Sequence, residues 1–205
     1  METQQYIVAG IGTEVGKTVI SAILVEKLQA DYWKPVQAGD LDHTDTNKVS
    51  SWVSNTQSVF HRERYRLHTP MSPHAAAAID GVSIQLSDFE LPQTTNNLIV
   101  ELAGGLMVPL NHQQLIVDLV AQLNLPVILV SNYYLGSINH TLLSIDLLKS
   151  RAIPIKGIIF NGTEVPTTKE VILDYSQLPH LGSIPQGETP NQEMIKAMTA
   201  HISLD

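Results

Sequence analysis

The chain has 205 residues, of which 43% are hydrophobic and 16% are charged, so it can bury a substantial core. Its net charge of −8 argues against nucleic-acid binding, which needs a basic surface. The absence of cysteine excludes disulfides and thiol chemistry. The first residues do not resemble a signal peptide, and the longest apolar run, 125–130, is too short to span a membrane. We therefore expect a cytoplasmic protein with one domain over residues 1–205 and no nucleic-acid or membrane partner.

Short apolar runs alternate with helical patterns along the chain. Runs typical of buried parallel strands occupy 6–9, 32–36, 98–102, 127–130, 155–160 and 181–184. Helical patterns occupy 17–28, 46–54, 113–123, 137–149, 167–175 and 192–202. This alternation predicts an α/β fold, a doubly wound and mostly parallel sheet with helices on both faces. Residues 60–92 are expected to form an excursion over the sheet that carries two short helices.

The segment from Gly10 to Thr18 is typical of a phosphate-binding loop, because it follows a strand, ends in Gly-Lys-Thr and opens a helix. Glycines let backbone N–H groups turn toward an anion, Lys17 can reach the terminal phosphates, and the Thr18 hydroxyl can ligate Mg²⁺. The usual pattern has glycine five residues before Gly16, where this chain has Ile11, so the loop is a longer variant. A chance surface turn is the alternative, and the strand–loop–helix context disfavours it. A P-loop NTPase is predicted, with nucleotide contacts from Glu14, Val15, Gly16, Lys17, Thr18 and Val19.

Charged residues follow two further strands, at the edge where ligands of such sheets bind. Lys34 lies in an apolar segment and needs an anionic partner, unless it reaches solvent from an edge strand. Asp45 and Glu101 are candidate Mg²⁺ ligands beside Thr18, since Mg²⁺ prefers hard oxygen ligands. For Asp45 the alternative is a helix N-terminal acid, whereas Glu101 at the end of an apolar run is harder to explain otherwise.

The later strand ends are predicted to hold the base of the nucleotide. Asn161 offers both a donor and an acceptor, which suits adenine, although Asn-Gly is also a common turn dipeptide. The remaining residues expected to contact the nucleotide lie at three strand ends: Leu102, Ala103, Gly104, Gly162, Pro185, Gln186 and Gly187.

An ordered set of motifs resembles the dethiobiotin synthetase family. The phosphate loop alone is shared with other nucleotide enzymes, but the full set between residues 10 and 185 is specific. The set comprises Gly-x-x-Thr-Glu-Val-Gly-Lys-Thr ending at Thr18, Lys34-Pro35-Val36, Asp45, Ser72-Pro73-His74, Val100-Glu101, Ala103-Gly104-Gly105, Leu135-Gly136-Ser137-Ile138-Asn139-His140, Asn161 and Leu181-Gly182-Ser183-Ile184-Pro185.

The resemblance implies an ATP- and Mg²⁺-dependent ligase of biotin synthesis. Such an enzyme closes 7,8-diaminononanoate and CO₂ (or bicarbonate) into a cyclic urea through a carbamate that ATP phosphorylates. Lys17 and Lys34 are then the catalytic residues. A homodimer is implied, in which a helix start from the second subunit holds the substrate carboxylate. The expected substrate contacts are Thr13, Lys34, Ala38, Ser137, Ile138 and Asn139.

Three departures from the family pattern leave other functions open. The family has Thr-Asp at Ile11-Gly12, Ser or Thr at Ala38, and Gly at Leu102, so a side chain is expected near the nucleotide or substrate at Leu102. A degenerate homologue that binds nucleotide without turnover is one alternative. A ParA/MinD-type switch ATPase is the other, but such proteins carry a second lysine early in the loop, where this chain has Gly12.

Overall fold

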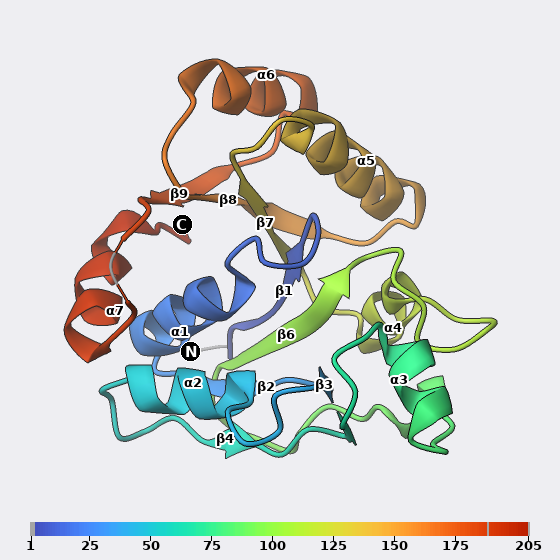
Figure 1. The fold of residues 1–205 in the computed structure, drawn as a ribbon. Coiled ribbons are helices and arrows are strands. Elements are labelled where there is room, and N and C mark those ends of the chain that lie inside the picture. Colours follow the sequence, from blue (N-terminus) through green and yellow to red (C-terminus); the bar gives the residue numbers. More distant parts are fainter. Residues whose placement is uncertain (1–2, 188, 205) are drawn as a thin grey trace.

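The computed structural model describes residues 3–187 and 189–204 and is built around a parallel sheet (Figure 1). In the described residues this sheet has seven strands in the order β4-β2-β6-β1-β7-β8-β9, and every neighbouring pair is parallel. The strands are β1 (Gln5–Gly10), β2 (Asp31–Trp33), β4 (Phe60–His61), β6 (Leu98–Gly105), β7 (Val127–Asn132), β8 (Ile155–Asn161) and β9 (His180–Ile184).

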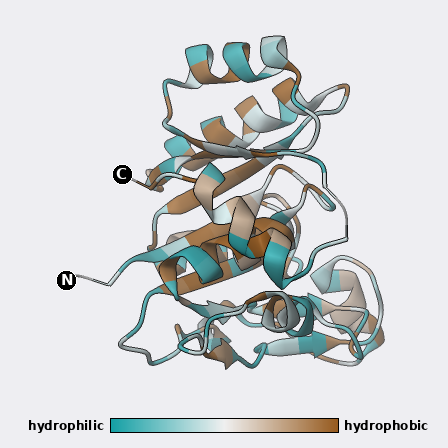
Figure 2. Ribbon diagram, turned by 90° about the vertical axis from the view of Figure 1, so that its left-hand side faces the viewer, coloured by the Kyte–Doolittle hydropathy of each residue, from teal (hydrophilic) through white to brown (hydrophobic). Residues whose placement is uncertain are grey.

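Helices cover both faces of the sheet, as predicted, because the strand residues alternate between two apolar cores. Ile7 and Ala9 face one core, whereas Tyr6 and Val8 face the other. Figure 2 shows the hydrophobic strands between the helical layers. The first core is covered by α3 (Pro73–Ile79), α4 (Ile116–Leu123), α5 (Ser137–Ser150) and α6 (Pro166–Ser176). The second is covered by α1 (Lys17–Leu28), α2 (Asp45–Trp52) and α7 (Gln192–Met198).

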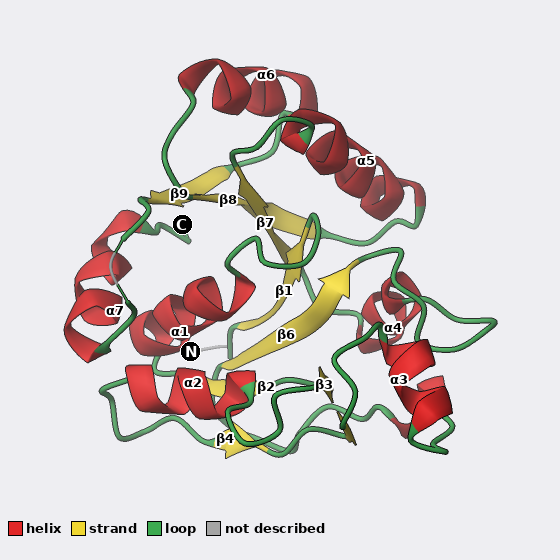
Figure 3. Cartoon of the chain, viewed as in Figure 1, coloured by secondary structure: helices red, strands yellow, loops and turns green. Residues whose placement is uncertain are grey.

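The topology creates a binding edge beside β1. After β1 the chain crosses through α1 to β2, and after β6 it crosses through α4 to β7, so β1 lies between β6 and β7. Ligands of open parallel sheets bind at the carboxyl ends of the strands where the winding reverses. The loops that follow β1, β2 and β6 gather at this edge (Figure 3).

The predicted strand 32–36 is two strands in the structure. β2 ends at Trp33, and β3 (Val36–Ala38) leaves the main sheet to pair in parallel with β5 (Tyr65–Leu67). Pro35 has no N–H to donate to a ladder, and its carbonyl accepts from Tyr65 N at 3.0 Å. Lys34 therefore lies in the break between the strands.

Other boundaries also differ from the sequence prediction. The helix expected over 113–123 begins at Ile116, and the one expected over 192–202 ends at Met198 and continues as the 3₁₀ turn η2 (Thr199–His201). The excursion over 60–92 contains two short helices as expected, α3 and the 3₁₀ turn η1 (Leu86–Asp88), together with the unpredicted strands β4 and β5. In the part of the chain that the structure describes, no helix is long and apolar enough to cross a membrane.

Candidate functional site

The phosphate loop joins β1 to α1 and needs glycine at two positions. Gly16 has φ of 95°, in the left-handed region, and a Cβ there would lie 2.1 Å from Asn161 Nδ2. A Cβ on Gly10 would lie 2.6 Å from the Val15 side chain. The loop is therefore packed against both a later strand end and its own apolar residue.

Lys17 is nearly buried within this loop. The residue is only 7% exposed, and its Nζ donates to the Gly12 carbonyl at 2.8 Å. Burial lowers the pKa of Lys17 to about 8, and the nearby ammonium of Lys34 adds to this effect, although the charge of Glu101 opposes it. A cation in such surroundings is stabilised by an anionic ligand.

Lys34 lies between the two predicted metal-binding carboxylates. Its Nζ forms an ion pair with Asp45 and contacts Glu101 Oε1 at 3.1 Å. Burial alone would lower the pKa of Lys34, but the charges of Glu101 and Asp45 outweigh it and raise that pKa. Burial likewise opposes ionisation of Asp45, yet the Lys34 charge holds its pKa below the ordinary value.

The oxygen atoms of this cluster fit a hard divalent cation. Thr18 Oγ1 donates to Glu101 Oε1 at 2.9 Å, so the predicted hydroxyl and carboxylate ligands lie together. The carboxylates of Asp45 and Glu101 both contact the Lys34 ammonium, so together they attract positive charge. Thr18, Asp45 and Glu101 are therefore the residues that could hold Mg²⁺.

Asp45 belongs both to the start of a helix and to the cluster around Lys34. It is the first residue of α2, and Thr44 before it forms a capping box with Asn47, whose N donates to Thr44 Oγ1 at 3.1 Å. Gln37 Oε1 accepts from Asp45 N at 3.2 Å. The helix-terminal interpretation of Asp45 and the site interpretation are thus both compatible with its position.

One cavity of about 700 Å³ brings together most of the predicted phosphate, metal and substrate residues. Leu102 is different: its side chain is 1% exposed, packs into an apolar core and does not line the cavity, so its expected contact with the nucleotide stays a prediction. Successive strand residues point to opposite faces, and Glu101 takes the position facing the site. The predicted residues that line the cavity are Thr13, Glu14, Gly16, Lys17, Thr18, Val19, Lys34, Ala38, Asp45, Glu101, Ala103 and Gly104.

An adjoining cavity of about 340 Å³ shares Glu14 and Val19 with the first. Asn161 lines it, but its Nδ2 already donates to the Val15 carbonyl at 3.1 Å, which ties β8 to the phosphate loop. The Val15 side chain itself is buried in the core. The other residues predicted to contact the base also line this cavity: Gly162, Pro185, Gln186 and Gly187.

The structure does not bring Ser137, Ile138 and Asn139 to these cavities within one chain. They form the start of α5, where Ser137 is buried and its N–H donates to the Tyr134 carbonyl at 3.0 Å. Leu135 before the helix is fully exposed and Ile138 is 37% exposed. This helix start therefore presents exposed side chains at the surface and does not line either cavity of its own chain.

Sequence reasoning missed Tyr32, which is fully buried and donates through its hydroxyl to Glu101 Oε2 at 2.9 Å. Burial and then the charge of Glu101 raise the pKa of Tyr32 well above its ordinary value, so the hydroxyl stays a donor. Two residues apart in an extended segment, Tyr32 and Lys34 point to the same side, and this spacing was the available signal.

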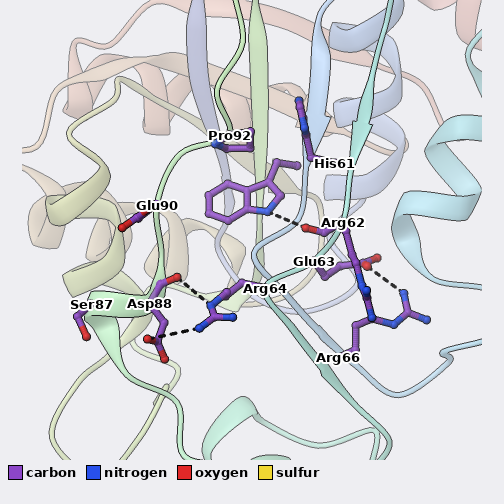
Figure 4. Close-up of a pocket in the computed structure, with 10 residues that line it drawn as sticks. His61, Arg62, Glu63, Arg64, Arg66, Ser87, Asp88, Glu90 and Pro92 are labelled. Carbon is purple, nitrogen blue, oxygen red and sulfur yellow. Dashed lines mark hydrogen bonds and ion pairs between the residues drawn. The ribbon is translucent and has the colours of Figure 1, made fainter.

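A third cavity, of about 810 Å³, lies beside β4 and β5 and is lined by charged side chains (Figure 4). Its charges largely satisfy one another, since Arg64 pairs with Asp88 at 3.4 Å and Arg66 with Glu63 at 2.9 Å. None of its described lining residues belongs to the predicted site.

Comparison with known proteins agrees with the motif set. A family model described as an AAA domain matches residues 4–193. The chain is 53% identical to the ATP-dependent dethiobiotin synthetase of Christiangramia forsetii, over 94% of this chain and 93% of that protein. It is 46% identical to the enzyme of the same name from Cytophaga hutchinsonii, over 95% and 94% of the two chains.

Solved structures share the fold at much lower identity. A ParA family ATPase from Chlorobium tepidum is 14% identical with a TM-score of 0.55, covering 98% of each chain. The MinD cell division protein of Aquifex aeolicus is 12% identical with a TM-score of 0.52, covering 97% of this chain and 95% of that one. These likenesses establish the P-loop fold alone, and the close relatives do not support the switch-ATPase alternative.

Proposed function

Because the chain belongs to the ATP-dependent dethiobiotin synthetase family, we propose that it joins 7,8-diaminononanoate and CO₂ into a cyclic urea at the expense of ATP. The observation that carries this proposal is the cluster of Lys34, Asp45 and Glu101 beside the phosphate loop. A carbamate and a triphosphate are both anions, so their reaction needs converging cations and a metal site, and this cluster can supply both.

The triphosphate binds the loop in this proposal, with Lys17 and the first N–H groups of α1 facing its terminal phosphates. Thr18, Asp45 and Glu101 would hold Mg²⁺, which supplies charge neutralisation on the phosphates. Asn161 and its neighbours in the adjoining cavity would hold the adenine. Its Oδ1 and the second N–H of its Nδ2 are left for the base, because only one N–H is needed for the bond to Val15.

Lys34 and Lys17 are the proposed catalytic residues. An amine of the substrate takes up CO₂ to give a carbamate, whose oxygen attacks the γ-phosphoryl group of ATP and releases ADP. The second amine then displaces phosphate and closes the ring. Lys34 would hold the carbamate and the transferring phosphoryl group, and its raised pKa keeps it charged for that role. No enzyme nucleophile is needed, because positioning and charge neutralisation lower the barrier.

The substrate carboxylate is proposed to bind the start of α5 from a second subunit. Helix N-termini attract anions, and Ser137, Ile138 and Asn139 do not line the cavity of their own chain. A homodimer would bring this helix start to the neighbouring site. We further propose that residues 1–205 form one nucleotide-binding domain acting in the cytoplasm, where ATP is supplied.

Product formation tests the proposal directly. Purified protein with MgATP, the diamine and bicarbonate should form dethiobiotin and ADP in equal amounts, and Lys34→Gln should abolish ring closure while it still binds ATP. A degenerate homologue would bind ATP without diamine-dependent turnover.

Asn161→Ala should raise the Michaelis constant for ATP, whereas an unchanged constant would favour a turn role for Asn161.

A further inference from the structure

Tyr32 at the centre of β2 contacts the predicted metal site from its buried side. The residue is fully buried, and its hydroxyl donates to Glu101 Oε2 at 2.9 Å. Its ring packs in the apolar core at 6.4 Å from the ring of Phe60. The phenol thus presents its polar atom only to the Glu101 carboxylate among the contacts that the structure describes.

The two oxygens of Glu101 have different partners. Oε1 accepts from Thr18 Oγ1 at 2.9 Å and from Lys34 Nζ at 3.1 Å, so it faces the phosphate loop. Oε2 points the other way, to Tyr32. Without the Tyr32 hydroxyl, Oε2 would be buried with no partner, which is costly, so this bond helps to fix which oxygen faces the cavity.

We propose that Tyr32 is a positioning residue for the metal–nucleotide complex, acting through the orientation of Glu101. The proposal rests on the proposed function, because it takes Glu101 to be a ligand of Mg²⁺ in that reaction. Carboxylate ligands of metals are themselves oriented by hydrogen bonds, and loss of such a partner typically weakens metal affinity by about 10- to 100-fold.

Tyr32→Phe isolates the hydroxyl, because phenylalanine keeps the ring that fills the core. Tyr65→Phe is the matched control: Tyr65 is 8% exposed, its hydroxyl also contacts a carboxylate, that of Asp88, and it does not line the nucleotide cavity. Thermal melting followed by circular dichroism first fixes a temperature at which wild type and both variants are folded.

Calorimetry then measures Mg²⁺ binding at saturating β,γ-imido ATP, and binding of the same analogue in EDTA. Tyr32→Phe should bind Mg²⁺ about 10- to 100-fold more weakly than wild type, with unchanged affinity for the analogue in EDTA. Tyr65→Phe should match wild type in both measurements.

Two results would overturn the inference in different ways. If Tyr32→Phe melts earlier but binds Mg²⁺ as wild type does, the hydroxyl contributes to stability alone. If wild type itself shows no Mg²⁺ binding with the nucleotide analogue, the metal role of Glu101 in the proposed function fails and this inference falls with it.

Discussion

At the scale of single residues, Lys17 links nucleotide binding to pH. Burial lowers its pKa to about 8, and a bound triphosphate would favour the ammonium and raise that pKa again. Below the pKa of the free protein, Lys17 is charged with and without ATP, so the affinity for ATP should not change with pH. Above it, binding requires uptake of a proton, so affinity should fall by up to about tenfold per pH unit.

Calorimetric titration of ATP between about pH 7.5 and about pH 9.5 measures this dependence. Lys17→Arg is the control, since a guanidinium stays charged across this range and its profile should be flat. A wild-type profile as flat as that of Lys17→Arg would contradict the lowered pKa.

Lys34→Met should destabilise the metal-free protein. The substitution leaves Asp45 and Glu101 together without their shared ammonium, and breaking a buried pair in this way costs roughly 3–5 kcal/mol. Urea denaturation measures the loss, and Mg²⁺ with ADP should restore part of it by replacing the missing cation. Lys48→Met is the control: Lys48 contacts Asp45 at 3.4 Å but is 36% exposed, so its loss should cost below about 1 kcal/mol. Equal losses would mean that the Lys34 pair is no stronger than a surface pair.

At the scale of elements, the sequence predicted the strands of the main sheet other than β4 and the helices that cover it, but not their ends. The start of α4 illustrates why: Asn111 Oδ1 accepts from the N–H groups of Gln113 and Gln114, each at 2.9 Å, and this side-chain turn competes with helix. The turn residues Gln113 and Gln114 are polar and resemble the exposed face of a helix, so the sequence pattern hides the boundary. Strands β4 and β5 are two and three residues long and depend on distant partners, so they leave no local pattern.

The cap of α2 is an element whose stability should be coupled to the site. Thr44→Ala removes the cap and should cost about 1 kcal/mol of stability. It should also raise the Mg²⁺ concentration needed for nucleotide binding, because Asp45 is the first residue of this helix. Asn191→Ala removes the cap of α7, where Asn191 Oδ1 accepts from Met194 N at 2.9 Å, and should cost similar stability without that effect. Denaturation and Mg²⁺ titration of both variants separate the two consequences.

At the scale of the whole molecule, the sequence predicted which strand ends meet but not how their side chains satisfy one another. The carboxyl-end rule selected Lys34, Asp45 and Glu101 from three separate segments, and the structure brings them into contact. The rule could not show that Lys34 forms ion pairs with both carboxylates. The sequence likewise marks Leu102 as the residue after Glu101 but not the face to which the strand turns its side chain, which packs into the core.

The shared-site model makes a prediction about mixed dimers. Each site would combine Lys17 and Lys34 of one subunit with the α5 start of the other, so two variants damaged in different parts can complement each other. Asn139→Asp is suited to the second part: Asn139 is exposed, an acid in the first turn of a helix does not destabilise it, and the new charge would repel the substrate carboxylate. Lys34→Gln damages the first part.

Mixed after dissociation and reassociation, Lys34→Gln and Asn139→Asp should recover about a quarter of wild-type activity, because half of the dimers are mixed and each has one intact site. A mixture of Lys34→Gln with Lys17→Ala should recover none, since both residues belong to the same half of the site. Light scattering of each mixture confirms that dimers have formed. Recovery in neither mixture, or wild-type activity from a monomer at the assay concentration, would show that the carboxylate is held within one chain. The exposure of Leu135 and Ile138 at the α5 start would then need another explanation.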